Sequence, residues 1–262
     1  MSKSQSSRDS SALLLHIPHS SLAIPIAVRE AMHIGDAELK AELLRMTDWY
    51  SDILFDLAGA QRLVFPYSRL CCDVERFPDD SAEPNSVHGM GAIYERTSYG
   101  NPLREPMTAE ARESYLERYY YPHHRELERM TEQMLKIRKR CLIVDCHSFP
   151  SVPLPCDLNK SPERRSDICI GTAGIQTPMP LVRQLVDACE VAGLAVSIDD
   201  PYSGAMIPQQ RILDRRVEAL MIEVRRGLYS DEGTGEKLVS FASTGELVRG
   251  LLQICQDFEM QS

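Results

Sequence analysis

The amino-acid sequence predicts a single three-layer αβα domain with a mixed, mainly parallel β-sheet. Short apolar runs recur along the chain and end abruptly in polar residues, as buried central strands of α/β proteins do. The clearest run is Cys141-Leu-Ile-Val-Asp145-Cys-His147-Ser148. Segments with helical spacing lie between these runs, without a linker or a repeat. This alternation is typical of strands that are joined by helices packed on the sheet.

Composition limits the class of protein and its partners. The chain has 262 residues, which is long enough for one large core or two small ones, and its 43% hydrophobic and 26% charged residues are ordinary for a globular protein. The net charge of −9 argues against nucleic acid or an anionic membrane as the main partner. No apolar run approaches the roughly 20 residues of a membrane span. The oligomeric state stays open.

The ends of the chain and its cysteines indicate a cytoplasmic protein. Residues 1–11 are polar and rich in serine, so they predict a disordered lead-in rather than a secretory signal, followed by one catalytic domain over residues 12–262. The eight cysteines include no Cys-x-x-Cys pair, and several lie within apolar runs, as small core residues do. A reduced, cytoplasmic protein is therefore expected.

In the N-terminal half, the first buried strand is expected over Ala12–Ile17 and ends at Pro18-His19. Asp36 is the expected N-cap of a helix from Ala37 to about Leu57, which has leucines at helical spacing. The elements expected next are strands over 62–66 and 69–73, a surface loop over 77–91 and a short strand over 93–96.

In the C-terminal half, a long helix is expected from Ala109 to about Lys139, with a kink or break at Pro122. Ser243 is the expected N-cap of the last helix, with Glu246 completing a capping box. Between them we expect the central strand, an irregular stretch over 149–165, a strand over 167–171, a helix over 178–191 that ends at Gly193, and strands over 195–198 and 217–224.

Several of these strands end in polar side chains, and ligands of open α/β sheets bind at the carboxyl ends of the strands. His19 and His147 are brought there by separate strands. Two histidines and one carboxylate match the ligand set of a catalytic zinc ion, and Asp48 is the carboxylate that we select. The alternatives are a strand-end histidine bonded to backbone for His147 and an exposed acidic stripe for Asp48, since aspartates recur every four residues there. His16 is expected to be a structural core histidine.

Glu223 is the candidate general base, because an unpaired buried glutamate in an apolar strand is costly without a purpose. An ion pair with Arg225 or Arg226 is an equally compatible interpretation. Other chemistries are less well supported. The chain has no Gly-x-Ser-x-Gly turn for a serine nucleophile and no dinucleotide fingerprint. Cys146 and His147 are neighbours on a strand and point to opposite faces.

Taken together, the polar motifs resemble those of the N-formylglutamate amidohydrolase family, which is itself similar to the zinc carboxypeptidases and the aspartoacylase group. The resemblance covers roughly residues 12–250. The motifs that carry it are Pro18-His-Ser-Ser, Thr47-Asp-Trp-Tyr, Ser68-Arg69, Asp73-Val-Glu-Arg76, Tyr121-Pro-His-His124, Asp145-Cys-His-Ser148, Asp200-Pro-Tyr-x-Gly204 and Ile222-Glu-Val-Arg225.

This resemblance implies a phosphorylase/hydrolase-like fold and zinc-dependent hydrolysis of an N-formyl or other N-acyl acidic amino acid. N-formyl-L-glutamate is the leading candidate, and its hydrolysis would be a last step of histidine breakdown. The resemblance implies that one zinc ion is bound by His19, Asp48 and His147. It implies that Glu223 is the general base. It also implies that the substrate is bound by Arg76, Arg69 and Tyr202.

The chain also departs from these families. Leu22 stands where the carboxypeptidase His-x-x-Glu pair has its glutamate, which is the reason for selecting Asp48. Glu75 replaces the usual asparagine of the Asp-x-Asn-Arg motif and leaves the substrate open. A zinc hydrolase of another N-acyl amino acid or short peptide, and an inactive small-molecule-binding relative, are the alternatives. The roles of His88, His123 and His124 are not assigned.

Overall fold

The computed structural model describes residues 11–158 and 165–261. Residues 1–10 of the expected lead-in lie outside these ranges, and Ser11 is buried. A six-stranded sheet of order β2-β1-β3-β6-β4-β5 forms the centre, and β4 and β5, which are parallel to each other, run antiparallel to the other four strands. The predicted mixed, mainly parallel sheet is confirmed. Its strands are β1 (Leu13–Ile17), β2 (Gln61–Val64), β3 (Cys141–Phe149), β4 (Ile168–Thr172), β5 (Val196–Ile198) and β6 (Val217–Arg225).

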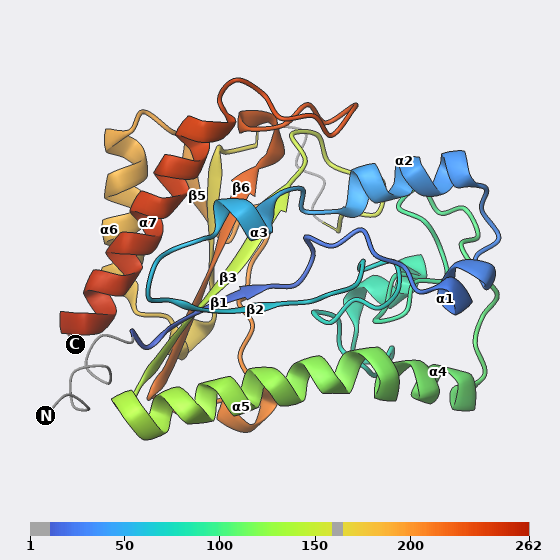
Figure 1. Ribbon diagram of the computed structural model, residues 1–262, viewed down its shortest axis with the longest axis horizontal. Helices are drawn as coiled ribbons and strands as arrows, with labels where there is room; N and C mark the ends of the chain where they lie inside the picture. Colours follow the sequence, from blue (N-terminus) through green and yellow to red (C-terminus); the bar gives the residue numbers. More distant parts are fainter. Residues whose placement is uncertain (1–10, 159–164, 262) are drawn as a thin grey trace, which may run out of the picture.

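Helices cover both faces of this sheet, with α6 and α7 on one side and α5 on the other (Figure 1). Alternate residues of a strand face opposite sides, so Leu15 packs with the α6 and α7 core and Leu14 with the α5 core. No helix among the described residues is long and apolar enough to cross a membrane. The helices are α1 (Ile26–Glu30), α2 (Asp36–Met46), α3 (Ser51–Leu54), α4 (Ala109–Tyr115), α5 (Tyr121–Arg138), α6 (Met179–Val191) and α7 (Phe241–Gln261).

The two central strands are longer than their apolar runs predict. Both β3 and β6 have nine residues, so His147 and Glu223 lie inside strands and not beyond their ends. The two residues are register partners across the β3–β6 pair. The strands can extend this far because the backbone N–H and C=O groups of β3 and β6 form hydrogen bonds with each other, whichever side chains the residues carry.

The helix expected over 37–57 is wrong in its second half. Helix α2 ends at Met46, with Gly35 rather than Asp36 as its N-cap, and Tyr50 has a positive φ of 61°. Asp48 lies in this break and is 1% exposed, so the exposed acidic stripe is wrong for it. The amide of Asp48 donates to the carbonyl of His19 at 3.0 Å, a long-range contact that a periodicity argument cannot include.

Two expected strands, over 69–73 and 93–96, are absent from the described chain. The first forms turns, and the second makes only isolated bridges, Met90 with Tyr94 and Arg96 with Pro102. The apolar residues here are buried in a separate core of irregular segments, where Leu70 and Leu103 pack together. Burial alone therefore did not distinguish a strand from a packed loop.

The two long helical predictions need smaller changes. Helix α4 passes without a gap through a π-helical segment, Leu116–Tyr120, into α5, so the irregularity lies just before Pro122 rather than as a break at it. Pro122 itself lies in the first turn of α5, where a missing amide costs little. The last helix begins at Phe241, so Ser243 is not its N-cap. The hydroxyl groups of Ser240 and Thr244 instead donate to the carbonyl of Leu228.

Candidate active site

The side chains expected to converge do lie together. His147 and Glu223 are neighbours on β3 and β6, and the imidazole of His19, just beyond β1, lies with its ring centroid 5.1 Å from that of His147. His19, His147 and Glu223 are 2%, 4% and 6% exposed. Asp48 reaches the same place from the break after α2. All four residues line a cavity of about 480 Å³.

His19 is held through one ring nitrogen and leaves the other free. Its Nε2–H donates to Asp73 Oδ1 at 2.9 Å, while Nδ1 is buried without a hydrogen-bond partner among the described residues. Burial raises the pKa of Asp73, but Arg69 and His19 bring it well below its usual value, so Asp73 is a carboxylate. An ionised acceptor fixes the proton on Nε2 and leaves the lone pair on Nδ1.

His147 is surrounded by carboxylates. Its Nδ1 lies 3.1 Å from Asp48 Oδ2, and its Nε2 lies 3.1 Å from Asp145 Oδ1 and 2.9 Å from Glu75 Oε2. Burial lowers the pKa of His147, and these carboxylates raise it well above its usual value. So many acceptors around one imidazole indicate a place where additional positive charge is stabilised.

Asp48 lies between the two histidines. Its Oδ2 is 3.7 Å from Nδ1 of His19 and 3.1 Å from Nδ1 of His147, and its Oδ1 accepts from Arg226 at 3.0 Å. Burial raises the pKa of Asp48, whereas His147, His19 and Arg226 lower it far below its usual value. Arg226 also donates a hydrogen bond to Ser148, which holds its guanidinium in place. Arg226 can therefore fix the orientation of the Asp48 carboxylate.

Glu75 is the residue that the sequence argument did not place in the centre. Its Oε2 lies 3.9 Å from Nδ1 of His19, and the candidate ligand atoms of His19, Glu75 and His147 lie within 4.8 Å of one another. His16, Glu75 and Asp145 form a second such group. The substitution of glutamate in Asp73-Val-Glu-Arg76 was the available signal, but it was interpreted only in terms of the substrate.

Glu223 carries a carboxyl oxygen, Oε2, that is buried and has no hydrogen-bond partner among the described residues. The alternative of an ion pair is wrong, because Arg225 pairs with Asp167 and Arg226 with Asp48. Burial raises the pKa of Glu223 to about 8, and the charge of Asp48 acts in the same direction. Glu223 can therefore both hold and release a proton near neutral pH.

The three residues expected to bind substrate all line this cavity, but they differ in how closely they are bonded to other side chains of the protein. Arg69 donates to Asp73 at 2.7 Å, and the hydroxyl of Tyr202 donates to Asp157 at 3.2 Å. The guanidinium of Arg76 is 3.5 Å from Asp73 and 3.7 Å from Glu83, and its Nε has no hydrogen-bond partner in the described chain. Arg76 is thus the more available of the two cations.

The remaining histidines do not reach the centre directly. His16 is buried with both nitrogens bonded, Nδ1 to Asp145 at 2.7 Å and Nε2 to His123 at 2.8 Å, as expected of a structural histidine. The Nε2–H of His124 donates to the carbonyl of Val74 at 2.8 Å. His88 ends the 3₁₀ turn Pro84–His88, of which Pro84 and Asn85 line the cavity and His88 does not.

A model of the N-formylglutamate amidohydrolase family matches residues 11–230. The chain belongs to this family. It is an amidohydrolase of the kind that acts on N-formylglutamate. Among curated proteins, none matches the chain in sequence at a significant level.

Two solved structures show the same fold. The N-formylglutamate amidohydrolase of Ralstonia eutropha JMP134 is 21% identical, with a TM-score of 0.84 over 97% of this chain and 95% of that one. The product of gene Atu2144 from Agrobacterium tumefaciens is 19% identical, with a TM-score of 0.64 over 97% and 94% of the two chains. At these identities the two structures show only the fold of this amidohydrolase. The roles of its residues are therefore argued from its own geometry.

Proposed function

We propose that this amidohydrolase uses one zinc ion to hydrolyse N-formyl-L-glutamate to formate and glutamate. The observation that carries the proposal is an unpartnered imidazole nitrogen, Nδ1 of His19, facing a carboxylate and a second imidazole beside the unpartnered carboxyl of Glu223. Membership in the family supports the choice of reaction and substrate.

The donor set fits zinc. His19 and His147 are each anchored through Nε2 to a buried carboxylate, Asp73 and Asp145, as zinc-binding histidines are. Both then offer Nδ1, and Asp48 Oδ2 lies within 3.7 Å of each Nδ1. Ligands bonded at about 2.0 Å to a tetrahedral zinc ion lie about 3.3 Å apart.

Asp48 is therefore our third ligand, and Glu75 is the other carboxylate within reach of the same place. A bound zinc ion supplies Lewis acidity and makes water nucleophilic at neutral pH. Glu75 Oε2 approaches Nε2 of His147, the nitrogen that faces Asp145, so it supports the orientation of that ring. Asp48 and Glu75 thus lie at different ring nitrogens of His147, Asp48 at Nδ1 and Glu75 at Nε2.

Glu223 is the proposed general base and acid. Its carboxyl is buried and forms no ion pair with residues 11–158 or 165–261, and burial raises its pKa to about 8, so its protonated and ionised forms are both accessible. In this mechanism it takes a proton from the attacking water and returns it to the departing amine nitrogen. The C–N amide bond breaks as the C–O bond of formate forms.

Arg76 is the proposed anchor for a substrate carboxylate. A guanidinium can bind a carboxylate through two parallel charge-assisted hydrogen bonds, and the weak pairing of Arg76 leaves it available for this. Arg69 and Tyr202 complete the same pocket. Because Arg69 is bonded to Asp73, we propose that it attracts the second carboxylate by charge while it fixes Asp73 behind His19.

The test is formate release by purified, zinc-restored protein. We expect N-formyl-L-glutamate to be hydrolysed much faster than N-formyl-L-leucine, which lacks the side-chain carboxylate, and we expect Arg76→Met to raise KM for the former. Treatment with a chelator should stop the reaction and added zinc should restore it. Protein with a full complement of zinc that releases no formate would refute the proposal.

A further inference from the structure

The hydroxyl group of Tyr94 is bonded to two charged side chains behind the catalytic cavity. It donates to Asp73 Oδ2 at 2.5 Å and accepts from Arg69 Nε at 3.0 Å, and the whole side chain is buried. Burial raises the pKa of Tyr94, so the hydroxyl keeps its proton and stays a donor. Tyr94 does not line the catalytic cavity. Its role in the reaction is therefore exerted through its two partners.

Asp73, Arg69 and Tyr94 form a closed group in which each side chain is bonded to the other two. Arg69 donates to Asp73 Oδ2 from Nη2 at 2.7 Å and from Nε at 3.2 Å. Hydrogen bonds to ionised groups are stronger than those between neutral groups. Oδ2 of Asp73 is thus held by two side chains, while Oδ1 accepts from the imidazole of His19.

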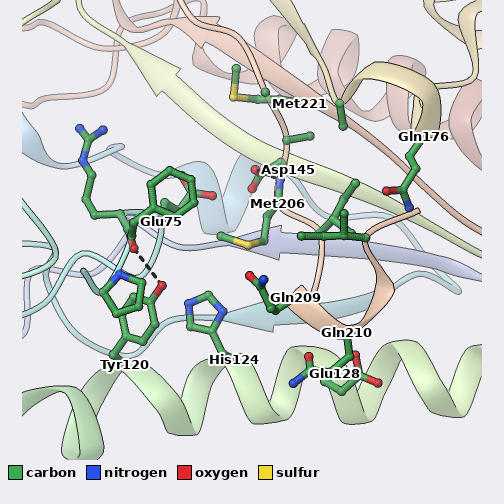
Figure 2. Close-up of a pocket in the computed structure, with 18 of the residues that line it drawn as sticks. Glu75, Tyr120, His124, Glu128, Asp145, Gln176, Met206, Gln209, Gln210 and Met221 are labelled. Atoms are coloured by element: carbon green, nitrogen blue, oxygen red, sulfur yellow. Dashed lines mark hydrogen bonds between the residues drawn. The ribbon is translucent and has the colours of Figure 1, made fainter. Parts of the chain in front are cut away.

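The main chain that carries Asp73 is fixed by other bonds. The amide of Asp73 donates to the carbonyl of Ala92 at 2.8 Å. Three residues further along, the carbonyl of Arg76 accepts from the hydroxyl of Tyr120 at 2.8 Å, and Figure 2 shows this bond in the wall of a second cavity of about 1030 Å³. Removing the hydroxyl of Tyr94 therefore changes the side chains that it holds rather than the course of the backbone.

We propose that the hydroxyl of Tyr94 positions two groups of the active site. Through Asp73 it fixes the orientation of His19, and through Arg69 it fixes the positive charge that attracts a substrate carboxylate. This inference rests on the proposed function, which assigns zinc to His19 and a dicarboxylate to the pocket. A zinc-binding histidine is oriented by the acceptor at its other ring nitrogen, and that acceptor must itself be held. A guanidinium already held in place does not have to be ordered when the substrate binds.

The first test is Tyr94→Phe, which removes the hydroxyl and keeps the ring in the core. We expect the Kd for zinc to rise about tenfold in chelator competition, since the partner of His19 loses one of its bonds. With saturating zinc, KM for N-formyl-L-glutamate should rise about fivefold and kcat should stay within about twofold, because Glu223 and the metal ligands remain. A purely structural role of Tyr94 would lower the free energy of unfolding and change neither constant.

The second test is Arg69→Lys, which loosens the same group from its other side. Lysine keeps the charge but lacks the rigid fork that bonds to Asp73 and Tyr94 at once. We expect both the Kd for zinc and KM to rise in this variant. Because Tyr94 acts on the substrate through Arg69, adding Tyr94→Phe to Arg69→Lys should raise KM further by less than about twofold.

The matched control is Tyr119→Phe. Tyr119 is buried in the same apolar core as Tyr94, packs edge to face against Tyr67 and Tyr115, and lines neither cavity. It should leave the Kd for zinc and KM unchanged. Unchanged constants in Tyr94→Phe, or equal changes in Tyr119→Phe, would overturn the inference. If the zinc-loaded wild type releases no formate, the proposed function fails, and the zinc measurements still decide whether Tyr94 acts on His19.

Discussion

Two buried histidine clusters lie side by side in this protein and differ in one respect. In the outer cluster, His19 and His147, one ring nitrogen of His19 has no hydrogen-bond partner in the described chain. In the inner cluster, His16 and His123, the ring of His16 is bonded at both nitrogens. Because an unpartnered buried polar atom is costly, its presence indicates a group reserved for a ligand, whereas a fully bonded ring indicates support.

Asp145 connects the two clusters. Its Oδ1 accepts from both His16 and His147, and its Oδ2 accepts from the amide of Met206 at 2.7 Å. Burial lowers the pKa of His16, but Asp145 and Glu75 raise it to about 9, while burial lowers the pKa of His123 to about 2. At neutral pH His16 is therefore charged and His123 neutral, and this fixed arrangement orients the outer ring.

The largest expected effect concerns the unpartnered carboxyl of the outer cluster. Glu223→Gln keeps the shape of the side chain but cannot take a proton, so we expect kcat for N-formyl-L-glutamate to fall by about 10²–10⁴. Zinc content, measured by atomic emission, should stay at that of the wild type. Retained turnover would place the general base elsewhere.

Removing a histidine of the inner cluster should lower the stability of the folded protein. His16→Leu leaves the buried carboxylate of Asp145 without its closest charged partner, so we expect the free energy of unfolding to fall by about 3–5 kcal/mol in urea titrations. The matched variant His19→Leu removes a ring with an unpartnered nitrogen and should instead abolish zinc binding at a smaller cost in stability. The reverse result would contradict the distinction between the clusters.

A smaller effect is expected from the acceptor behind His19. Asp73→Asn keeps a hydrogen-bond acceptor for Nε2–H but removes the negative charge, so we expect the Kd for zinc to rise about 10–100-fold in chelator competition. Asp36→Asn, an exposed carboxylate beside Arg29, serves as the control and should leave zinc affinity unchanged.

The smallest effect concerns His124, which burial keeps neutral by lowering its pKa from 6.5 to about 4. The unfolded chain binds this proton more readily than the folded protein, so stability is complete above pH 6.5 and is lost as the pH falls toward 4. This group should cost about 2 kcal/mol of unfolding free energy between pH 8 and pH 5. His124→Gln should show a correspondingly flatter pH dependence in denaturant titrations, and an equal slope would exclude this contribution.

Local pattern was sufficient for the regular part of the molecule. Apolar runs located β1, β3, β4 and β6, because a strand buried on both faces must be apolar over several consecutive residues. The same runs brought His19, His147 and Glu223 to neighbouring positions, since parallel strands place their carboxyl ends at one edge. The convergence of these three residues could therefore be predicted from the sequence, while their roles remain a proposal.

The irregular segments were decided by tertiary contacts. The break that aims Asp48 inward is held by a hydrogen bond to His19, and Glu75 reaches the centre from turns stabilised by the amide of Asp73 donating to the carbonyl of Ala92. Such contacts join residues far apart in the chain and have no period to detect. The sequence by itself determined which strands carry the two histidines and the candidate base, and it selected Asp48 as their carboxylate. Only the tertiary structure decided that Asp48 is buried between them and that Glu75 joins it, because both depend on contacts between distant segments.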